Sequence, residues 1–387
     1  MKTAAIICEY NPFHNGHKLH IDKTREAGAT HIIAVMSGNF VQRGDAALFD
    51  KFTRAKTALE NGADLVIELP ERVSLTSAER FAGGAVELIT ALGCVDMLSF
   101  GSECGDIAAL REASGAIDYS VHTDFFSELI KRGKSYPSAL QATLLEYYTD
   151  DVAEIIASPN NTLAIEYLNA LDNAGNTIEP FTIRREGAAH DSDSAEPGEE
   201  FVSASLIRKL ILSGGDCSSY APLVSAPAAD ISRLERAVLA KLRTMSAYEL
   251  EEIFDGANGL GTRLYKAVRS AKTLPEAYFL TKTKRYTLAR IRRAVMCAFL
   301  GITRDFALEK SAYIRVLGMN ARGKEILSAA ENCTLPIDTS LKALSKTSRS
   351  AARQANFTAK CTDVWQLALE NPGRCGEDFT TPPIIME

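Results

Sequence analysis

The sequence lacks paired cysteines and long hydrophobic runs. None of its eight cysteines forms a CxxC pair, which argues against a zinc ribbon and against a disulfide framework, so these cysteines are expected to be small buried hydrophobes. No apolar run approaches the roughly 20 residues that cross a bilayer. The apolar stretch at the start is too short for a signal peptide. We therefore expect a cytoplasmic protein with no membrane partner.

Basic residues do not dominate the composition either. The formal net charge is −6, which argues against a protein that coats DNA or RNA over its whole surface but is compatible with a local basic patch. The 46% hydrophobic and 24% charged fractions are typical of a soluble globular chain. A chain of 387 residues is long enough for two domains.

The first hundred residues alternate short apolar runs with helical patterns. Strands are predicted at the four apolar runs, and helices lie between them at 16–27, 49–61 and 77–92. The predicted strands cover residues 3–8, 31–36, 64–69 and 97–101. This alternation predicts an α/β fold with a Rossmann-like parallel sheet covered on both faces. Ligands bind beyond the carboxyl ends of such strands.

The rest of the chain is mostly helical in pattern. Helices are predicted over 106–157 and up to about residue 173, followed by a strand near 178–185 and an acidic loop at 186–200. A further helix follows residue 203, and helical patterns continue from a linker at 218–230 to roughly residue 370. We therefore predict a nucleotide-binding domain at 1–225 and a mainly α-helical domain at 226–387.

Half of the six histidines lie in one short segment, CEYNPFHNGHKLH, at residues 8–20. After the first strand, a turn at Asn11-Pro12-Phe13 and the flexible Gly16 would bring His14 and His17 to a helix N-terminus. Free N–H groups and the helix dipole favour phosphate there, and imidazole N–H groups would add donors. A three-histidine metal site fits less well, because the outer pair would diverge by about 240° around one helix. A helix cap with incidental histidines remains the structural alternative.

A second segment, SASLIR at 203–208, has the pattern of another phosphate site. Ser203 and Ser205 can cap a helix and donate to phosphate, and Arg208 lies about one turn further on, where it suits pyrophosphate. An N-cap serine followed by a basic residue is common in ordinary helices. The segment gains weight because it follows the HNGH segment in the chain.

The order of these segments resembles a known superfamily. NPFHNGH after a first strand is similar to the HxGH motif of the HIGH-type nucleotidyltransferases, whose two histidines bind ATP phosphates. Five blocks in sequence order also resemble one family, the bacterial tRNA(Met) cytidine acetate ligases. These blocks are EYNPFHNGH, MSGNFVQRGD, LENGADLVIELP, SPNN and KTKRYTLARIRR.

The resemblance implies a reaction in two steps. ATP and acetate would form acetyl-adenylate, and the acetyl group would pass to N4 of the wobble cytidine of elongator tRNA(Met). His14, His17 and Arg208, together with Mg²⁺, would hold the charge of the leaving pyrophosphate. The alternatives are an adenylyltransferase acting on a small phosphorylated metabolite and a non-catalytic nucleotide- or RNA-binding module.

The resemblance also implies the residues around ATP. The set comprises Ile7, Cys8, Glu9, Tyr10, Asn11, Pro12, Phe13, His14, Asn15, Gly16, His17, His20, Gly101, Asn161, Arg185, Ser203 and Ser205. Within this set His20 fits a packing or surface role better than a phosphate contact. The choices between Asn160 and Asn161 and between Arg184 and Arg185 stay open. The family pattern differs at Ser205-Leu206, at 186–200, where His190 and Asp191 remain, and at 255–264.

The densest basic run lies at residues 282–293, which contain no acidic residue. The predicted RNA-contacting residues are Lys282, Lys284, Arg285, Arg290, Arg292 and Arg293. Tyr286 could stack on a base. A run of this kind is also typical of a solvated helix face.

Overall fold

A mixed sheet of eight strands forms the centre of the molecule. The computed structural model describes residues 1–185 and 201–387. Within these residues the strand order is β10-β8-β5-β2-β1-β6-β7, and β9 pairs with β8. The strands are β1 (Thr3–Cys8), β2 (His31–Ser37), β5 (Leu65–Leu69), β6 (Met97–Ser102), β7 (Glu179–Arg184), β8 (Ile314–Met319), β9 (Ile337–Asp338) and β10 (Ile384–Ile385).

Five of these strands form a parallel core. The neighbouring strands along β5-β2-β1-β6-β7 are all parallel, with β1 in the middle, whereas β8 adds to β5 in the antiparallel direction. The predicted Rossmann-like sheet is therefore confirmed. The four predicted strands were visible in the sequence because both faces of a parallel sheet are buried, which makes each strand a continuous apolar run.

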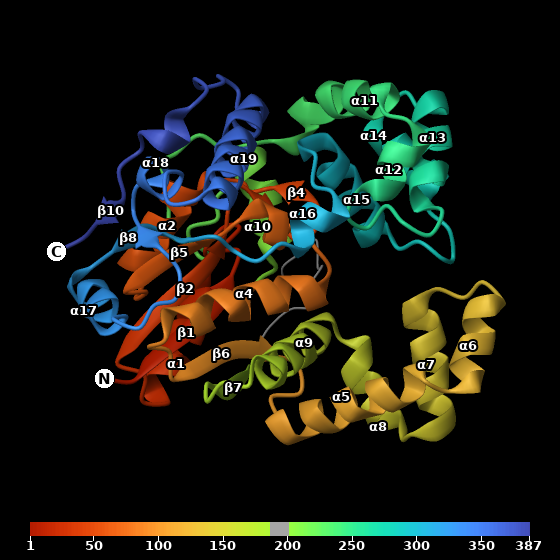
Figure 1. Cartoon of the computed structure of the whole chain (residues 1–387), viewed down its shortest axis with the longest axis horizontal. Coiled ribbons are helices and arrows are strands. Elements are labelled where there is room, and N and C mark those ends of the chain that lie inside the picture. The colour runs from red at the N-terminus through yellow and green to blue at the C-terminus, as the bar shows by residue number, and fades with distance from the viewer. Residues whose placement is uncertain (186–200) are drawn as a thin grey trace.

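Helices cover both faces of this core (Figure 1). On one face, Ile6 of β1 and its neighbours pack against α1 (Asn15–Glu26) and α2 (Lys51–Glu60). On the other face, Ala5 packs with α4 (Ala78–Leu92) and α9 (Pro159–Ala174). Successive residues of a strand point to opposite faces, so Ala5 and Ile6 belong to different cores.

Three insertions interrupt the alternation of strands and helices. A hairpin of β3 (Phe40–Val41) and β4 (Asp45–Ala46) follows β2, and the short α3 (Glu71–Ser74) follows β5. Between β6 and α9 a group of four helices projects from the sheet (Figure 1). The four helices are α5 (Ile107–Val121), α6 (Asp124–Lys131), α7 (Tyr136–Tyr147) and α8 (Asp150–Ala157).

A second helical group has its own core. Six helices follow α10 (Ala204–Leu212) and the 3-10 helix η1 (Ile231–Leu234) in sequence. The core of this group includes Leu264, Val295 and Trp365. The six are α11 (Glu235–Thr244), α12 (Ala247–Glu252), α13 (Leu260–Ser270), α14 (Leu274–Thr281), α15 (Leu288–Leu300) and α16 (Arg304–Leu308). This part of the chain is helical, as the pattern after residue 226 predicts.

The last part of the chain returns to the sheet. Strands β8, β9 and β10 lie there, so residues 226–387 supply both the helical group and one edge of the central sheet. The other elements of this part are α17 (Ala321–Ala329), α18 (Leu341–Leu344), α19 (Arg349–Trp365), η2 (Gln366–Ala368) and η3 (Glu377–Phe379). The pattern-based expectation of helices up to residue 370 missed these strands.

A buried cluster of charges ties this returning segment to the core. The Lys51 ammonium contacts Glu68 Oε1 at 2.6 Å and Asp378 Oδ2 at 2.7 Å, and Arg315 Nη1 contacts Asp378 Oδ1 at 2.7 Å. All four side chains are at most 2% exposed. Buried charges of this kind are tolerated only when they are paired, so the cluster fixes the position of η3 against α2, β5 and β8. Across the described part of the chain, no helix is both long and apolar enough to span a membrane.

Candidate active site

The predicted site residues converge at the carboxyl ends of β1 and β6. These strands are adjacent at the middle of the sheet, and the chain leaves β1 toward α1 on one face but leaves β6 toward α9 on the other. Such a point, where the strand order reverses, leaves a crevice in which ligands of α/β proteins bind. His14 follows β1 and Gly101 lies near the end of β6, so both motifs border this crevice.

His14 and His17 are fixed by the start of α1. His14 is the N-cap residue: its Nδ1 accepts a hydrogen bond from the backbone N–H of Gly16 at 3.1 Å, while its own N–H donates to Nδ1 of His17 at 3.2 Å. An imidazole nitrogen that accepts an N–H carries no proton, so both rings are neutral tautomers with the proton on Nε2. The rings stack with centroids 3.6 Å apart. Each ring can therefore donate from Nε2 and not from Nδ1.

The surroundings of His17 keep it neutral. Burial, followed by the nearby His14 and Arg185, holds the pKa of His17 well below its usual value of 6.5. Two stacked imidazolium rings would repel each other, and the low pKa avoids that state. Gly16 suits this point, because a Cβ there would lie 3.1 Å from the His14 ring, a tight contact that the ring would have to relieve by a small shift.

Aromatic side chains form the floor beneath the histidines. Tyr10 packs edge-on against Phe13 and His17, with ring centroids 4.8 and 4.9 Å apart. Tyr10 has φ of 46°, a left-handed backbone that is strained for a residue other than glycine. Ile7 and Cys8 end β1 and pack into the cores on its two faces. These side chains shape the site, and the backbone that follows them turns toward α1.

The second predicted motif meets the first one in space. Ser203 caps α10 by accepting a hydrogen bond from Leu206 N at 3.1 Å. Arg208 donates from Nη1 to the backbone carbonyl of Asn11 at 2.8 Å and from Nη2 to Ser205 Oγ at 3.0 Å. The guanidinium is therefore held beside the turn that leads to His14. The SASLIR segment and the HNGH segment, about 190 residues apart in sequence, therefore lie side by side, as a shared phosphate site would require.

The remaining members of the HNGH segment hold this arrangement together. Asn11 Oδ1 accepts from Leu48 N at 2.7 Å. Asn15 donates from its backbone N–H to Tyr220 O and from its side chain to Ser219 O, both at 2.9 Å. Pro12 follows Asn11 in a cis peptide. The predicted linker at 218–230 thus covers the start of α1.

Asn161 and Arg185, each one of two neighbouring candidates left open by the sequence, lie near the ends of β6 and β7 and make different contacts. A Cβ on Gly101 would lie 3.3 Å from Arg185 Cγ, so the side chain of Arg185 lies across Gly101, toward His17. Asn161 is 2% exposed, and its Oδ1 accepts the N–H groups of Glu103 and Cys104 at 2.8 and 3.1 Å. Its amide Nδ2 donates to Ile155 O at 3.0 Å. Asn161 therefore shapes the turn after β6, and Arg185 is the group that faces the histidines.

His20 lies apart from the phosphate donors. Its Nε2 contacts Ser99 Oγ at 3.0 Å, and that hydroxyl also bonds Thr24 at 2.7 Å. Burial, with a smaller effect of Arg185, lowers the pKa of His20 to about 4. The side chain joins α1 to β6 in its neutral form, as expected for a packing residue.

Two side chains that support the site were not predicted from the sequence. Arg54 is 1% exposed and donates to the carbonyls of Glu9 at 2.6 Å and Phe49 at 3.0 Å, and also to that of Gly38. Glu103 accepts from the backbone N–H of Asn161 at 2.7 Å at the start of α9. An arginine inside an amphipathic helix gives no signal that it will be buried. Glu103 directly follows β6, and no sequence pattern singled it out.

The basic segment at 282–293 contains both exposed side chains and side chains that bond to other parts of the protein. Lys282, Lys284, Arg285 and Arg292 are exposed. Arg290 donates to the carbonyls of Asp255 and Ala257 at 3.1 and 2.8 Å, and Arg293 donates to Asp255 Oδ2 at 2.6 Å. The stacking role considered for Tyr286 does not fit, because its ring is 6% exposed and its hydroxyl donates to Asn258 O at 2.6 Å.

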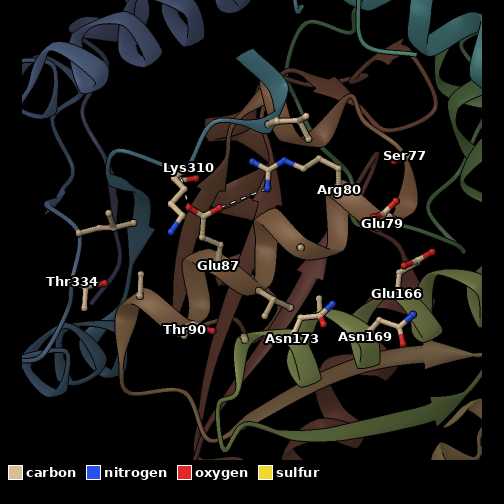
Figure 2. A pocket seen from close by; sticks show the side chains of 18 of the residues that line it. Ser77, Glu79, Arg80, Glu87, Thr90, Glu166, Asn169, Asn173, Lys310 and Thr334 are labelled. Atoms are coloured by element: carbon tan, nitrogen blue, oxygen red, sulfur yellow. Dashed lines mark hydrogen bonds and ion pairs between the residues drawn. The ribbon is translucent and has the colours of Figure 1, made fainter. Parts of the chain in front are cut away.

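A cavity of about 740 Å³ lies away from this site, between α4, α9 and the 308–311 segment (Figure 2). Figure 2 shows Glu79 and Glu166 on one side of it, Lys310 and Thr334 on the other, and the ion pair of Arg80 and Glu87 between them. None of the predicted site residues lines it. In the described ranges no group of three or more His, Cys, Asp or Glu side chains is placed to hold a metal ion. His190, Asp191 and the rest of the predicted 186–200 loop lie outside the described residues.

Comparison with known proteins agrees with this geometry. The HIGH Nucleotidyl Transferase family matches residues 1–377. The tRNA(Met) cytidine acetate ligase of Syntrophomonas wolfei is 33% identical over 99% of both chains, and that of Thermoanaerobacter sp. (strain X514) is 37% identical over 99% of this chain and 100% of the relative. A crystal structure of Thermotoga maritima TmcAL bound with alpha-thio ATP has a TM-score of 0.88 at 30% identity, over 100% of both chains. The chain therefore belongs to the tRNA(Met) cytidine acetate ligase family, within the HIGH nucleotidyl transferases.

Proposed function

We propose that this protein is an ATP-dependent ligase that activates acetate as acetyl-adenylate and transfers the acetyl group to N4 of the wobble cytidine of elongator tRNA(Met). The observation that carries the proposal is the meeting of His14, His17 and Arg208 at the carboxyl end of β1. Full-length relatives named tRNA(Met) cytidine acetate ligase support the choice of substrates.

In the first step an acetate oxygen attacks the α-phosphorus of ATP. The bond to the bridging oxygen of the β-phosphate breaks, and pyrophosphate leaves with the negative charge. The Nε2–H groups of His14 and His17 and the guanidinium of Arg208 are donors fixed before the reaction, so they stabilise this charge without reorganising. Acetate is already an anion at neutral pH, so this step requires no base.

ATP is the co-substrate of this chemistry, as the family and the nucleotide-bound Thermotoga maritima structure indicate. Mg²⁺ carried on the nucleotide phosphates stays a prediction.

In the second step the cytidine N4 attacks the carbonyl carbon of acetyl-adenylate. Activation is needed because the exocyclic amine of cytosine is a poor nucleophile. We assign the exposed Lys282, Lys284, Arg285 and Arg292 to phosphates of the tRNA, which would set affinity and orientation. Selection of one cytidine requires the base to leave its stack and enter the site. A cytoplasmic location follows from this substrate as part of the proposal.

The alternative, an adenylyltransferase for a small phosphorylated metabolite, is not favoured, because relatives covering the whole chain are ligases. Exchange of labelled pyrophosphate into ATP separates the two directly. The proposal predicts exchange that depends on acetate and needs no phosphorylated acceptor. Exchange that ignores acetate but requires such a metabolite, with a dinucleotide-like product, would favour the alternative.

A further inference from the structure

Glu9 is the first residue after β1, and it lies at the same sheet edge as the histidines. Its backbone carbonyl accepts a hydrogen bond from Arg54 Nη1 at 2.6 Å, and its Oε1 accepts one from Gln42 N in the hairpin at 2.8 Å. For Oε2, the part of the chain that the structure describes provides no hydrogen-bond or ion-pair partner. Glu9 is thus held firmly at both its backbone and one carboxyl oxygen, and the second oxygen stays available.

The environment of Glu9 combines burial with nearby cations. Burial raises the pKa of Glu9, whereas the Gln42 N–H and the guanidinium groups of Arg43, Arg208 and Arg54 act in the opposite direction. Arg208 is also the group that we assign to the leaving pyrophosphate. The carboxyl group therefore lies beside the predicted phosphate site, where the phosphoryl end of acetyl-adenylate would be held.

The hairpin that bonds to Glu9 also contacts the basic helix. Gly44, at φ +73°, packs so tightly that a Cβ there would lie 2.5 Å from the backbone carbon of Arg292 and 2.6 Å from Arg293 N. Gln42 and Gly44 are two residues apart in one turn, so Glu9 and α15 contact the same short hairpin. An RNA held by the exposed residues of the 282–292 region would therefore approach the site at the hairpin that bonds to Glu9.

The second half of the proposed reaction has a proton to remove. When N4 of cytidine attacks the acetyl carbon, a C–N bond forms, the bond from that carbon to the AMP oxygen breaks, and AMP leaves as an anion. The nitrogen must lose one proton to give the neutral amide. We propose that Oε2 of Glu9 accepts this proton from the N4 amine, which makes Glu9 the general base of acetyl transfer. This inference rests on the proposed function.

The substitution Glu9→Gln tests the proposal through the two half-reactions. The amide oxygen of glutamine can still accept the Gln42 N–H, so the hairpin contact is kept while the base is lost. We expect acetate-dependent pyrophosphate exchange to stay within about threefold of the wild type. Single-turnover transfer of acetyl groups to tRNA should fall by about 100-fold or more, since general bases contribute about 10²–10⁴-fold.

Glu166→Gln is a matched control. Glu166 is another partly buried carboxyl, with its pKa raised to about 7 by burial and by Glu79, but it lines the separate cavity of Figure 2. This variant should carry out both half-reactions at wild-type rates.

Three outcomes would overturn the assignment of Glu9 in distinguishable ways. Wild-type transfer rates in Glu9→Gln would show that no proton passes to this residue. An equal loss of exchange and transfer would indicate that Glu9 positions the nucleotide or the hairpin. Exchange without acetylated RNA in the wild-type protein would remove the proposed function itself, and the role of Glu9 with it.

Discussion

At the scale of single residues, the site depends on which ring nitrogen of each histidine accepts a hydrogen bond from the backbone. His14 and His17 both accept a backbone N–H at Nδ1, so each neutral ring carries its proton on Nε2. Their spacing predicted the pair and the helix N-terminus. The tautomer could not be predicted, because it depends on the N-cap geometry and on the hydrogen bond between the two histidines.

The two roles of His14 can be separated by substitution. Asparagine is a good N-cap residue, so His14→Asn should keep the start of α1, whereas His14→Ala should lose both the cap and the phosphate donor. We expect both variants to lower acetate-dependent pyrophosphate exchange by about 100-fold, the usual effect of losing one such donor. Thermal unfolding should show a lower Tm for His14→Ala alone. Full exchange activity in His14→Asn would exclude a phosphate role for this ring.

His20 makes the folded state sensitive to acid. Its pKa is lowered from 6.5 to about 4, so between these values the unfolded chain binds a proton that the folded protein does not. Its contribution is therefore present above pH 6.5 and is lost as the pH falls. His20→Gln should reduce the loss of unfolding free energy between pH 7.5 and pH 5 by about 2 kcal/mol. Urea unfolding at both pH values measures this, and equal losses in the two proteins would contradict it.

Asn161 shows what residue-level prediction leaves open. The SPNN segment is predicted to contact the nucleotide, which stays a prediction, and in the structure both ends of the Asn161 amide bond to the backbone at Glu103, Cys104 and Ile155. Sequence patterns identify a polar residue near a site without revealing its hydrogen-bond partners. Arg185 was predicted from the same kind of pattern and does face His17.

At the scale of elements, the five parallel strands were predictable, including β7 at one edge, whereas β8, β9 and β10 at the other edge were not. β1, β2, β5 and β6 are continuous apolar runs separated by clear helical patterns. Strand β8 has a similar apolar run, IRVLGM, but it lies between helical segments, where a short apolar run cannot be told from a buried helix turn. Its place beside β5 depends on contacts across about 250 residues.

The loop between α14 and α15 is the element that we expect to bind RNA. Reversing the charges of the exposed Lys282, Lys284 and Arg285 to Glu should weaken tRNA binding and reduce the dependence of log K on log salt concentration by about 2 to 3. Acetate-dependent pyrophosphate exchange should be unchanged. Filter binding over a range of salt concentrations measures both quantities.

A matched triple variant at Lys56, Arg322 and Lys324, which are exposed on α2 and α17, controls for net charge. It should leave the salt dependence of tRNA binding unaltered. If both triple variants reduce binding equally, only the overall charge matters, and the assignment of the α14–α15 loop is wrong.

At the scale of the whole molecule, the chain ends in the sheet where it began. The cluster of Lys51, Glu68, Arg315 and Asp378 joins the last segment to the core. A boundary at residue 225 stays a prediction, because the part after it contributes both the helical group and an edge of the sheet. The length of the chain is compatible with two domains, but neither length nor composition reveals that residues after 225 add strands to the first sheet.

This cluster should make folding depend on the final segment. Asp378→Asn removes one partner of two buried cations, which typically costs about 3–5 kcal/mol because a charge is left unpaired. The Lys51 and Arg315 cations outweigh the effect of burial and lower the pKa of Asp378 to about 2, so the carboxylate contributes stability above pH 3.8 that is lost as the pH falls toward 2. Urea unfolding at pH 7 should show the destabilisation, and an unchanged midpoint would refute this account.

The most direct test of the whole account follows labelled acetate into RNA. The purified protein is incubated with ATP, radiolabelled acetate, Mg²⁺ and unmodified elongator tRNA(Met), and the RNA is digested to nucleosides. We predict ATP-dependent label in N4-acetylcytidine, at the wobble position only, and its loss in the His14→Ala/His17→Ala double variant. Label elsewhere in the RNA, no labelled nucleoside, or full activity in the double variant would contradict the account.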